Sequence, residues 1–190
     1  IITIVQDTLL GINKLTKSEK IDYINDSSGG IYYNENTNMY KVQDTNDINQ
    51  MLDETSYFNK TQMMNIICNL STFNGIPPKP SKTISVNGND IDLWSGKTIL
   101  SYILPNNLNL EMENSSYDNN IDDTEYNDKL NKIVIKNGEL IQGRIDKKIL
   151  SSGTRGIVHI IFNDYGWEKA QLFLDNLQNI NYSIGTDGLS

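Results

Sequence analysis

At 190 residues, the chain is long enough for one ordinary domain or two small ones. Its 16 Lys and Arg against 24 Asp and Glu give a formal net charge of −8, which argues against a free-standing nucleic-acid-binding protein with a basic face. A single cysteine and a single histidine exclude a disulfide scaffold and a standard zinc site. The apolar runs are too short for a membrane span of about 20 residues, and we expect no signal peptide.

The composition also indicates the kind of genome that encodes the chain. Asn and Ile each occur 26 times, whereas Ala occurs once and Arg twice. Codons for Asn and Ile are AT-rich and those for Ala are GC-rich, so we expect an AT-rich source. The sequence begins with Ile1 rather than Met, inside residues 1–5 (IITIV), which read as a β-strand. We therefore expect the chain to have been excised from a longer protein.

The next part of the sequence is predicted to be a polar insertion followed by a helix. Residues 16–55 are rich in Asn, Asp, Ser and Gly, and their apolar residues are too sparse for a long amphipathic helix. Tyr32, Tyr33 and residues 39–42 (MYKV) predict a small hairpin within this stretch. Residues 61–70 (TQMMNIICNL) have apolar side chains at helical spacing, with Asn59 or Thr61 as the cap.

The middle of the chain is predicted to contain an extended linker and a second helix. Residues 73–80 (FNGIPPKP) favour the linker, because each proline biases its predecessor away from helix. Ser95 is placed to cap the helix, and Pro105 would end it. Its apolar face would comprise Ile99, Leu100, Ile103 and Leu104.

The last part is predicted to contain a loop, a hairpin, a strand and a helix. Residues 111–128 hold seven acidic residues and no basic one, so we interpret them as a solvated or disordered loop. Residues 132–143 predict a hairpin, because apolar runs flank Asn137-Gly138, a dipeptide that type I′ turns prefer. Residues 157–162 (IVHIIF) predict a buried strand, followed from about Asp164 by a helix. The apolar face of that helix would comprise Trp167, Ala170, Phe173, Leu174 and Leu177.

Taken together, these elements predict an α+β fold, with a small mixed sheet, hairpins and short helices but no βαβ repeat.

The sequence contains no complete catalytic constellation. Gly96-Lys97-Thr98 ends like a phosphate-binding P-loop, but Ile91 stands where that loop needs its first glycine. His159 lies in an apolar run and is interpreted as a core histidine, and Cys68 as a buried packing residue. The acidic pairs at residues 53–54 and 122–123 are assigned to solvated surface.

Several short motifs follow one another along the chain. They are residues 4–16 (IVQDTLLGINKLT), 75–80 (GIPPKP), 93–101 (LWSGKTILS), 103–105 (ILP), 137–143 (NGELIQG), 146–148 (DKK), 151–153 (SSG) and 156–160 (GIVHI). In this order they resemble one stretch of the largest subunit of multisubunit DNA-directed RNA polymerases, closest to the eukaryotic and large-DNA-virus type. The resemblance spans nearly the whole chain except two polar insertions.

The resemblance implies a division of the chain within that subunit. Residues 1–110 would be the first part of the pore domain, with a polar insertion at about 17–56. Residues 111–130 would be an acidic loop, and residues 131–190 the second part of the pore domain and the start of the funnel. The last helix would be shortened after residue 178, which leaves the role of residues 179–190 open.

The resemblance also implies a function in transcription, as part of a nucleotidyltransferase. The pore domain lines the secondary channel, through which nucleotides enter and backtracked RNA leaves. Lys147 and Lys148 match lysines that face incoming nucleoside triphosphates, although an adjacent lysine pair can also be an ordinary solvated turn. The catalytic aspartate loop lies upstream of this stretch, so we expect no catalytic residue, cofactor or metal here, and Mg²⁺ only in the complete polymerase.

The implied partners are the other polymerase subunits, especially the second-largest one, with nucleoside triphosphates and RNA in the channel and DNA in the complete enzyme. No membrane is implied. The expected location is intracellular: the virion or host cytoplasm for a viral enzyme, the nucleus for a cellular one. An alternative hypothesis is a non-catalytic interaction module from a split or truncated polymerase gene.

Overall fold

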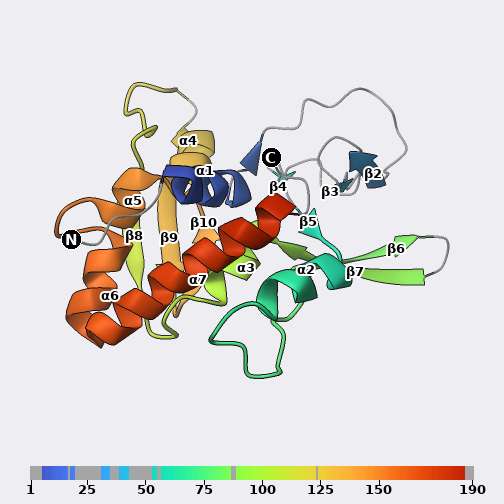
Figure 1. The fold of residues 1–190 in the computed structure, drawn as a ribbon. Helices are drawn as coiled ribbons and strands as arrows, with labels where there is room; N and C mark the ends of the chain where they lie inside the picture. The colour runs from blue at the N-terminus through green and yellow to red at the C-terminus, as the bar shows by residue number, and fades with distance from the viewer. Residues whose placement is uncertain are drawn as a thin grey trace.

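The computed structural model describes residues 6–16, 18–19, 31–34, 39–42, 53–54, 57–86, 89–122 and 124–186. The predicted strand at residues 1–5 lies outside these ranges. Within them, helices and small antiparallel sheets are mixed, which confirms the α+β class (Figure 1). The helices are α1 (Gln6–Leu15), α2 (Lys60–Ile67), α3 (Gly96–Ser101), α4 (Thr124–Asn131), α5 (Lys147–Ser151), α6 (Ile157–Tyr165) and α7 (Trp167–Thr186).

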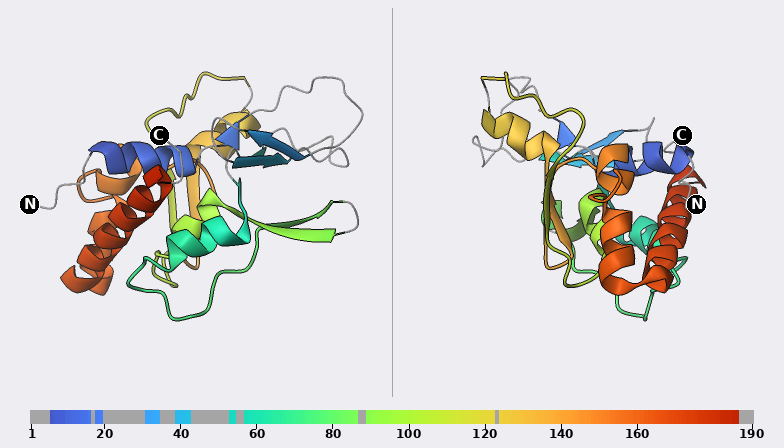
Figure 2. Two further views of the ribbon diagram at one scale, coloured as in Figure 1. Left: turned by 45° about the vertical axis from the view of Figure 1, so that its right-hand side comes forward. Right: turned by 90° about the vertical axis from the view of Figure 1, so that its left-hand side faces the viewer.

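The strands form three antiparallel groups. A five-stranded sheet has the order β2 (Ile31–Asn34), β3 (Met39–Val42), β5 (Tyr57–Phe58), β7 (Asn89–Ser95) and β6 (Lys82–Val86). A three-stranded sheet has the order β10 (Glu139–Gln142), β9 (Lys132–Lys136) and β8 (Leu110–Glu113), and β1 (Ser18–Glu19) pairs with β4 (Asp53–Glu54). The outer part of the β6–β7 ribbon projects from the body of the molecule (Figure 2).

The two predicted hairpins are both present. In the first, β2 pairs with β3 so that Tyr33 stands opposite Tyr40. In the second, β9 and β10 are joined at Asn137 and Gly138, whose φ angles of 50° and 77° are both positive, as a type I′ turn requires. A local dipeptide preference was sufficient to predict this turn.

The interpretation of residues 111–128 as a loop is wrong at both ends. Strand β8 occupies the beginning and pairs along its whole length with β9, while α4 begins at Thr124. Between β8 and α4, the described residues form neither helix nor strand, but hydrogen bonds hold them in place. Asn114 and Asn127 are buried, and the Asn127 side-chain amide donates to the Asp118 carbonyl at 2.7 Å. High charge misled the interpretation, because the glutamates of β8 occupy exposed positions that alternate with half-buried Leu110 and Met112.

The predicted strand at residues 157–162 is also wrong, since α6 occupies this run. Its buried residues are Ile157, Val158 and Ile161, a spacing that fits one face of a helix, whereas Phe162 is 45% exposed. Gly156 precedes the helix in extended conformation as its N-cap. β-branched residues favour strands only weakly, and packing of one helical stripe against α5 and α7 overrides that preference.

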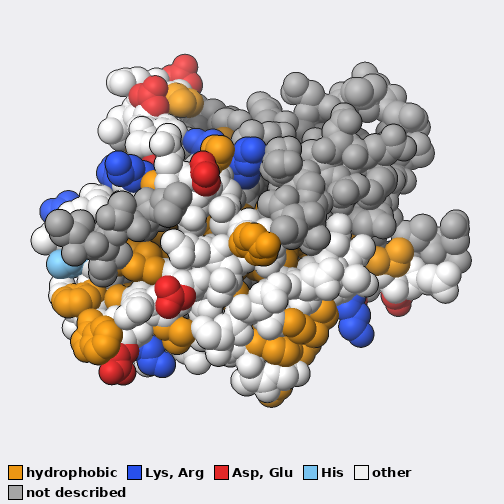
Figure 3. All heavy atoms as spheres, in the orientation of Figure 1, with side chains coloured by type: hydrophobic (Ala, Val, Ile, Leu, Met, Phe, Trp, Pro, Cys, Tyr) orange, Lys and Arg blue, Asp and Glu red, His pale blue; other side chains and the backbone are white. Residues whose placement is uncertain are grey.

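Helix α7 crosses the molecule diagonally in Figure 1 and contacts α1, α2 and α6. Ala170, Phe173 and Leu177 are buried as predicted, but Trp167 is 61% exposed. The helix continues to Thr186, and Ile180 and Ile184 are buried, so the expectation of a shortened last helix is wrong. In Figure 3, apolar side chains gather at the surface over the α6–α7 corner.

The caps of α2 and α3 follow the local sequence. Asn59 caps α2 in a reciprocal capping box with Gln62, which selects Asn59 over Thr61. Ser95 caps α3, and the apolar face predicted for this helix is buried, although the helix ends at Ser101 rather than at Pro105. Cys68 follows α2 and is exposed, so its interpretation as a buried packing residue is wrong. The linker at residues 73–80 contains neither helix nor strand, as predicted.

Candidate functional site

The predicted site residues Lys147 and Lys148 form the first turn of the short helix α5, and both are exposed. Asp146 begins this turn as the N-cap, and its carboxylate accepts a hydrogen bond from the Ile149 backbone N–H at 3.0 Å. The other carboxylate oxygen accepts bonds from the backbone N–H and the hydroxyl of Ser115, in the loop after β8. The lysines therefore project from a capped helix start rather than from a free turn.

Asp146 is held in its charged form by these contacts. Burial raises the pKa of its carboxyl, but the hydrogen bonds from Ser115 and Ile149 and the positive charge of Lys148 outweigh burial, so the pKa lies below its ordinary value. The carboxylate consequently remains a hydrogen-bond acceptor at neutral pH. This keeps the helix start and the loop after β8 attached to each other.

Helix α1 holds the segment from the other side, through the buried residue just before Asp146. The Asn13 side-chain amide donates to the Ile145 carbonyl at 3.0 Å, and the Thr16 hydroxyl accepts from the Ile145 N–H at 2.9 Å. Thr16 and Ile145 are both fully buried. Both backbone groups of Ile145 are thus bonded to α1 or to Thr16, the residue directly after it, so the position of the lysine pair depends on the end of this helix.

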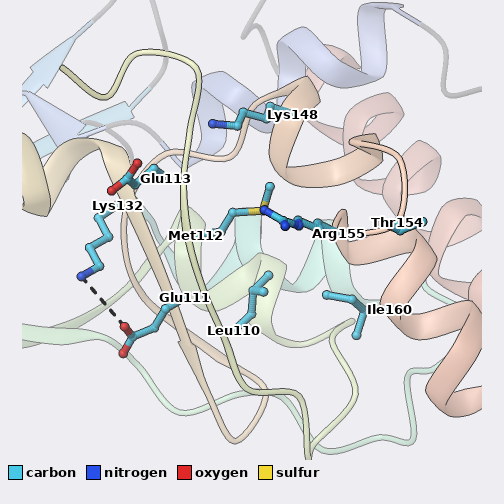
Figure 4. A pocket seen from close by; sticks show the side chains of 9 residues that line it. All are labelled: Leu110, Glu111, Met112, Glu113, Lys132, Lys148, Thr154, Arg155 and Ile160. Carbon is cyan, nitrogen blue, oxygen red and sulfur yellow. Dashed lines mark ion pairs between the residues drawn. The ribbon is translucent and has the colours of Figure 1, made fainter. Parts of the chain in front are cut away.

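A hollow of about 560 Å³ opens between β8, the start of α5 and the loop that leads into α6. Figure 4 shows the side chains that line it. They are Leu110, Glu111, Met112, Glu113, Lys132, Lys148, Thr154, Arg155 and Ile160. Lys148 lines this hollow and Lys147 does not, so the structure separates the two lysines of the predicted pair.

Because side chains alternate along β8, the charged residues around the hollow lie on two sides of this strand. In Figure 4, Glu111, Glu113 and Lys132 lie on one side of β8, and the side chains of Lys148 and Arg155 lie on the other. The Lys132 ammonium is 3.9 Å from a Glu111 carboxylate oxygen, so this lysine is already paired. Among the described residues, the Arg155 side chain makes no hydrogen bond or ion pair. Of the three cations that line the hollow, Arg155 is therefore the one without a partner among the described residues, whereas the charge of Lys148 also acts on Asp146.

Sequence reasoning identified Lys148 but missed Arg155. Arg155 is one of only two arginines in the chain and stands between Gly153 and Gly156, in the loop before α6. The interpretation of the following residues as a strand hid its relation to α5. Once α6 is a helix that packs against α5, the loop between them brings Arg155 to the same hollow as Lys148.

Other residues singled out in the sequence form no site. Lys97 is buried beside Gly96, whose Cα faces the Leu15 carbonyl with no room for a side chain, so Gly96-Lys97-Thr98 is a packed helix start. His159 is half-buried rather than in the core, and its Nε2 lies 2.8 Å from the Asn163 side-chain nitrogen.

Two further features, a metal-binding cluster and a membrane-spanning helix, are absent from the described residues. They contain no group of three or more His, Cys, Asp or Glu side chains that could hold a metal ion. Over the same part of the chain, every helix is too short or too polar to cross a membrane.

Comparison with known proteins identifies the family. The sequence model of the family "RNA polymerase Rpb1, domain 3" matches residues 1–190. DNA-directed RNA polymerase subunit Rpo1N of Thermococcus celer is 29% identical in an alignment 152 residues long, and the match covers 67% of this chain. The chain spans 16% of the length of that relative. The chain therefore belongs to the RNA polymerase Rpb1, domain 3 family and is part of the largest subunit of a DNA-directed RNA polymerase.

Proposed function

We propose that this chain forms part of the wall of the secondary channel in a DNA-directed RNA polymerase, and that Lys147 and Lys148 attract nucleoside triphosphates there. The observation that carries the proposal is the exposed lysine pair on a start of α5 that is anchored by α1 and by Ser115. The family match over the whole chain supports the context. In a chain of net charge −8, this pair is a positive position on an otherwise acidic molecule.

Attraction without tight binding is what a channel requires. Lys ammonium groups are flexible point charges that draw a polyanion without the fixed geometry of a bidentate clamp. Their effect extends over a Debye length of about 8–10 Å at ordinary salt. Nucleotides would therefore be concentrated near the wall and still pass along it.

The chemistry of RNA synthesis is proposed to reside elsewhere in the complete enzyme, a nucleotidyltransferase. Two-metal phosphoryl transfer needs a rigid cluster of carboxylates. The described residues offer no such cluster, so we propose that Mg²⁺ binds to other parts of the polymerase and that this chain alone is inactive. Its proposed partners are the other polymerase subunits, the second-largest above all, with nucleotides and RNA in the channel and DNA in the assembled enzyme.

The proposed location follows from transcription. For a viral enzyme it would be the virion or host cytoplasm, and for a cellular enzyme the nucleus. The Asn- and Ile-rich composition supports a large DNA virus or an AT-rich protist as the source.

The test is Lys147→Glu with Lys148→Glu in the assembled polymerase. Two unit charges 10 Å apart in water interact with about 0.4 kcal/mol, reduced roughly threefold by salt at one Debye length. A change of four charge units against a triphosphate thus sums to roughly 2 kcal/mol, so the Michaelis constant for nucleotides should rise by up to about 30-fold, with a smaller change in maximal rate. The increase should shrink at high salt.

The exposed Lys136, at the end of β9, supplies the matched control for this charge reversal. Lys136→Glu should leave the nucleotide dependence unchanged. An unchanged nucleotide dependence of the double variant at low salt would show that the pair is a solvated helix start. Purification without a second large polymerase subunit would instead favour the alternative of a separate interaction module.

A further inference from the structure

We propose that Asn74 is a modification site, at which the Asn74-Gly75 peptide deamidates to aspartate and isoaspartate without an enzyme. The dipeptide Asn-Gly occurs three times in the chain, at residues 74–75, 87–88 and 137–138. Residues 87–88 lie outside the described residues, so the structure allows a comparison of the other two pairs. The inference goes beyond the proposed channel role and does not depend on it.

The reaction needs only the peptide itself and water. The Gly75 nitrogen, after losing its proton, attacks Cγ of Asn74, and the new N–Cγ bond closes a five-membered succinimide ring. The bond between Cγ and Nδ2 breaks, and Nδ2 takes up a proton and leaves as ammonia. Water then opens the ring, giving aspartate where the new N–Cγ bond breaks and isoaspartate where the original peptide bond breaks.

The first argument is that the attacking nitrogen is unbonded at Gly75 and bonded at Gly138. Among the described residues, the Gly75 N–H makes no hydrogen bond. The Gly138 N–H donates to the Leu108 carbonyl at 2.9 Å. An N–H that donates a hydrogen bond loses its proton less readily, because the acceptor stabilises the protonated form. The nucleophile is therefore more easily formed at Gly75 than at Gly138.

The second argument is the position of the side-chain amide of Asn74. Its Oδ1 accepts a hydrogen bond from the Ile76 backbone N–H at 3.0 Å, which folds the side chain back over the Gly75 peptide as in an Asx turn. The same hydrogen bond polarises the amide carbonyl and stabilises the negative charge that develops on Oδ1 during the attack. The side chain of Asn137 makes no hydrogen bond in the part of the chain that the structure describes.

The third argument is the room around each glycine. Ring closure has to turn the glycine peptide toward the asparagine side chain. Gly75 is exposed in the open loop below α2 in Figure 1, and a Cβ added there would meet no atom within 4 Å. Gly138 is buried, and a Cβ added there would lie 2.5 Å from the Pro105 carbonyl oxygen. The linker can therefore reach the ring geometry more easily than the turn between β9 and β10.

Deamidation at this position would alter a segment that is bonded to the rest of the fold. The Tyr102 hydroxyl donates to the Ile76 carbonyl at 3.1 Å, and the Trp94 indole N–H donates to the Pro78 carbonyl at 2.9 Å. Isoaspartate inserts one methylene group into the main chain just before these carbonyls, and both products add a negative charge. We therefore expect the bond from Tyr102 to weaken first in the modified chain.

The experiment is ageing of the assembled polymerase in buffers of increasing pH. Mass spectrometry of proteolytic peptides measures the conversion of amide to acid at each Asn-Gly pair, and chromatography separates aspartate from isoaspartate. We expect Asn74 to react at least about fivefold faster than Asn137, a factor that corresponds to one ordinary hydrogen bond. The rate at Asn74 should rise with pH, because the Gly75 nitrogen attacks only after it has lost its proton.

Two controls separate the effect of the fold from that of the local sequence. In the same enzyme unfolded in urea, the two pairs should react at nearly equal rates, because both have lost their tertiary surroundings. In the folded enzyme, Gly75→Ala should slow the reaction at Asn74 and leave Asn137 unchanged, since a Cβ shields the nitrogen and disfavours the φ of 89° found here. Equal rates at Asn74 and Asn137 in the folded enzyme, an unchanged rate in Gly75→Ala, or a rate difference that persists in urea would each overturn the proposal.

Discussion

Replacement of Thr16 by Val tests whether α1 positions the lysine segment. The substitution preserves the shape of a fully buried side chain and removes the hydroxyl that accepts from the Ile145 N–H at 2.9 Å. Ile145 is fully buried, so its N–H would lose its partner without gaining water, at a cost of about 1–3 kcal/mol. The Ile12 carbonyl, which also receives the hydroxyl, keeps its bond from the Thr16 N–H at 3.1 Å. The cost therefore falls on Ile145.

Hydrogen exchange of the peptide that contains Ile145, carried out in the assembled polymerase, measures the loss of stability at this segment itself. A loss of 1–3 kcal/mol corresponds to amide exchange about 5- to 150-fold faster if opening is local. Thr16→Ser is the matched control, since it keeps the hydroxyl and loses one methyl group, worth about 0.8 kcal/mol or roughly a fourfold change. Equal exchange rates in the two variants would refute the claim that this hydrogen bond, rather than packing alone, holds the segment.

Three further substitutions probe the Asp146 cap and the positive-φ glycines Gly138 and Gly153. The lowered pKa of Asp146 means that its contribution to stability is present above the ordinary carboxyl pKa and is lost as pH falls through the lowered value. Asp146→Asn should therefore flatten the acid limb of stability against pH, measured by urea unfolding, and an unchanged acid limb would contradict the assignment. Gly138→Ala and Gly153→Ala both place Ala at positive φ, which lowers the free energy of unfolding by about 1–2 kcal/mol each. Gly138→Ala should cost more, because its Cβ would lie 2.5 Å from the Pro105 carbonyl oxygen whereas Gly153 faces open space; equal unfolding midpoints would show that the turn relaxes.

Elements whose physics is local were predictable from the sequence. The Asn137-Gly138 turn depends on two residues that tolerate positive φ, and the caps at Asn59 and Ser95 depend on side chains that reach backbone donors three residues away. Lys148 entered the candidate site through a motif. For the turn and the two caps, the relevant contacts lie within a few residues along the chain.

The tertiary structure decided what depends on distant partners. The run 157–162 has β-branched residues that suit a strand, yet one helical stripe of it packs against α5 and α7. The acidic residues after Leu110 read as a loop, because the pairing of β8 with β9 that orders them comes from a segment about 20 residues later. Arg155 and Met112 lie 43 positions apart and share a hollow only because β8, α5 and α6 assemble around it. Charge and propensity are properties of single residues, whereas a cavity is a property of the packing among elements, so only the folded chain could reveal this one.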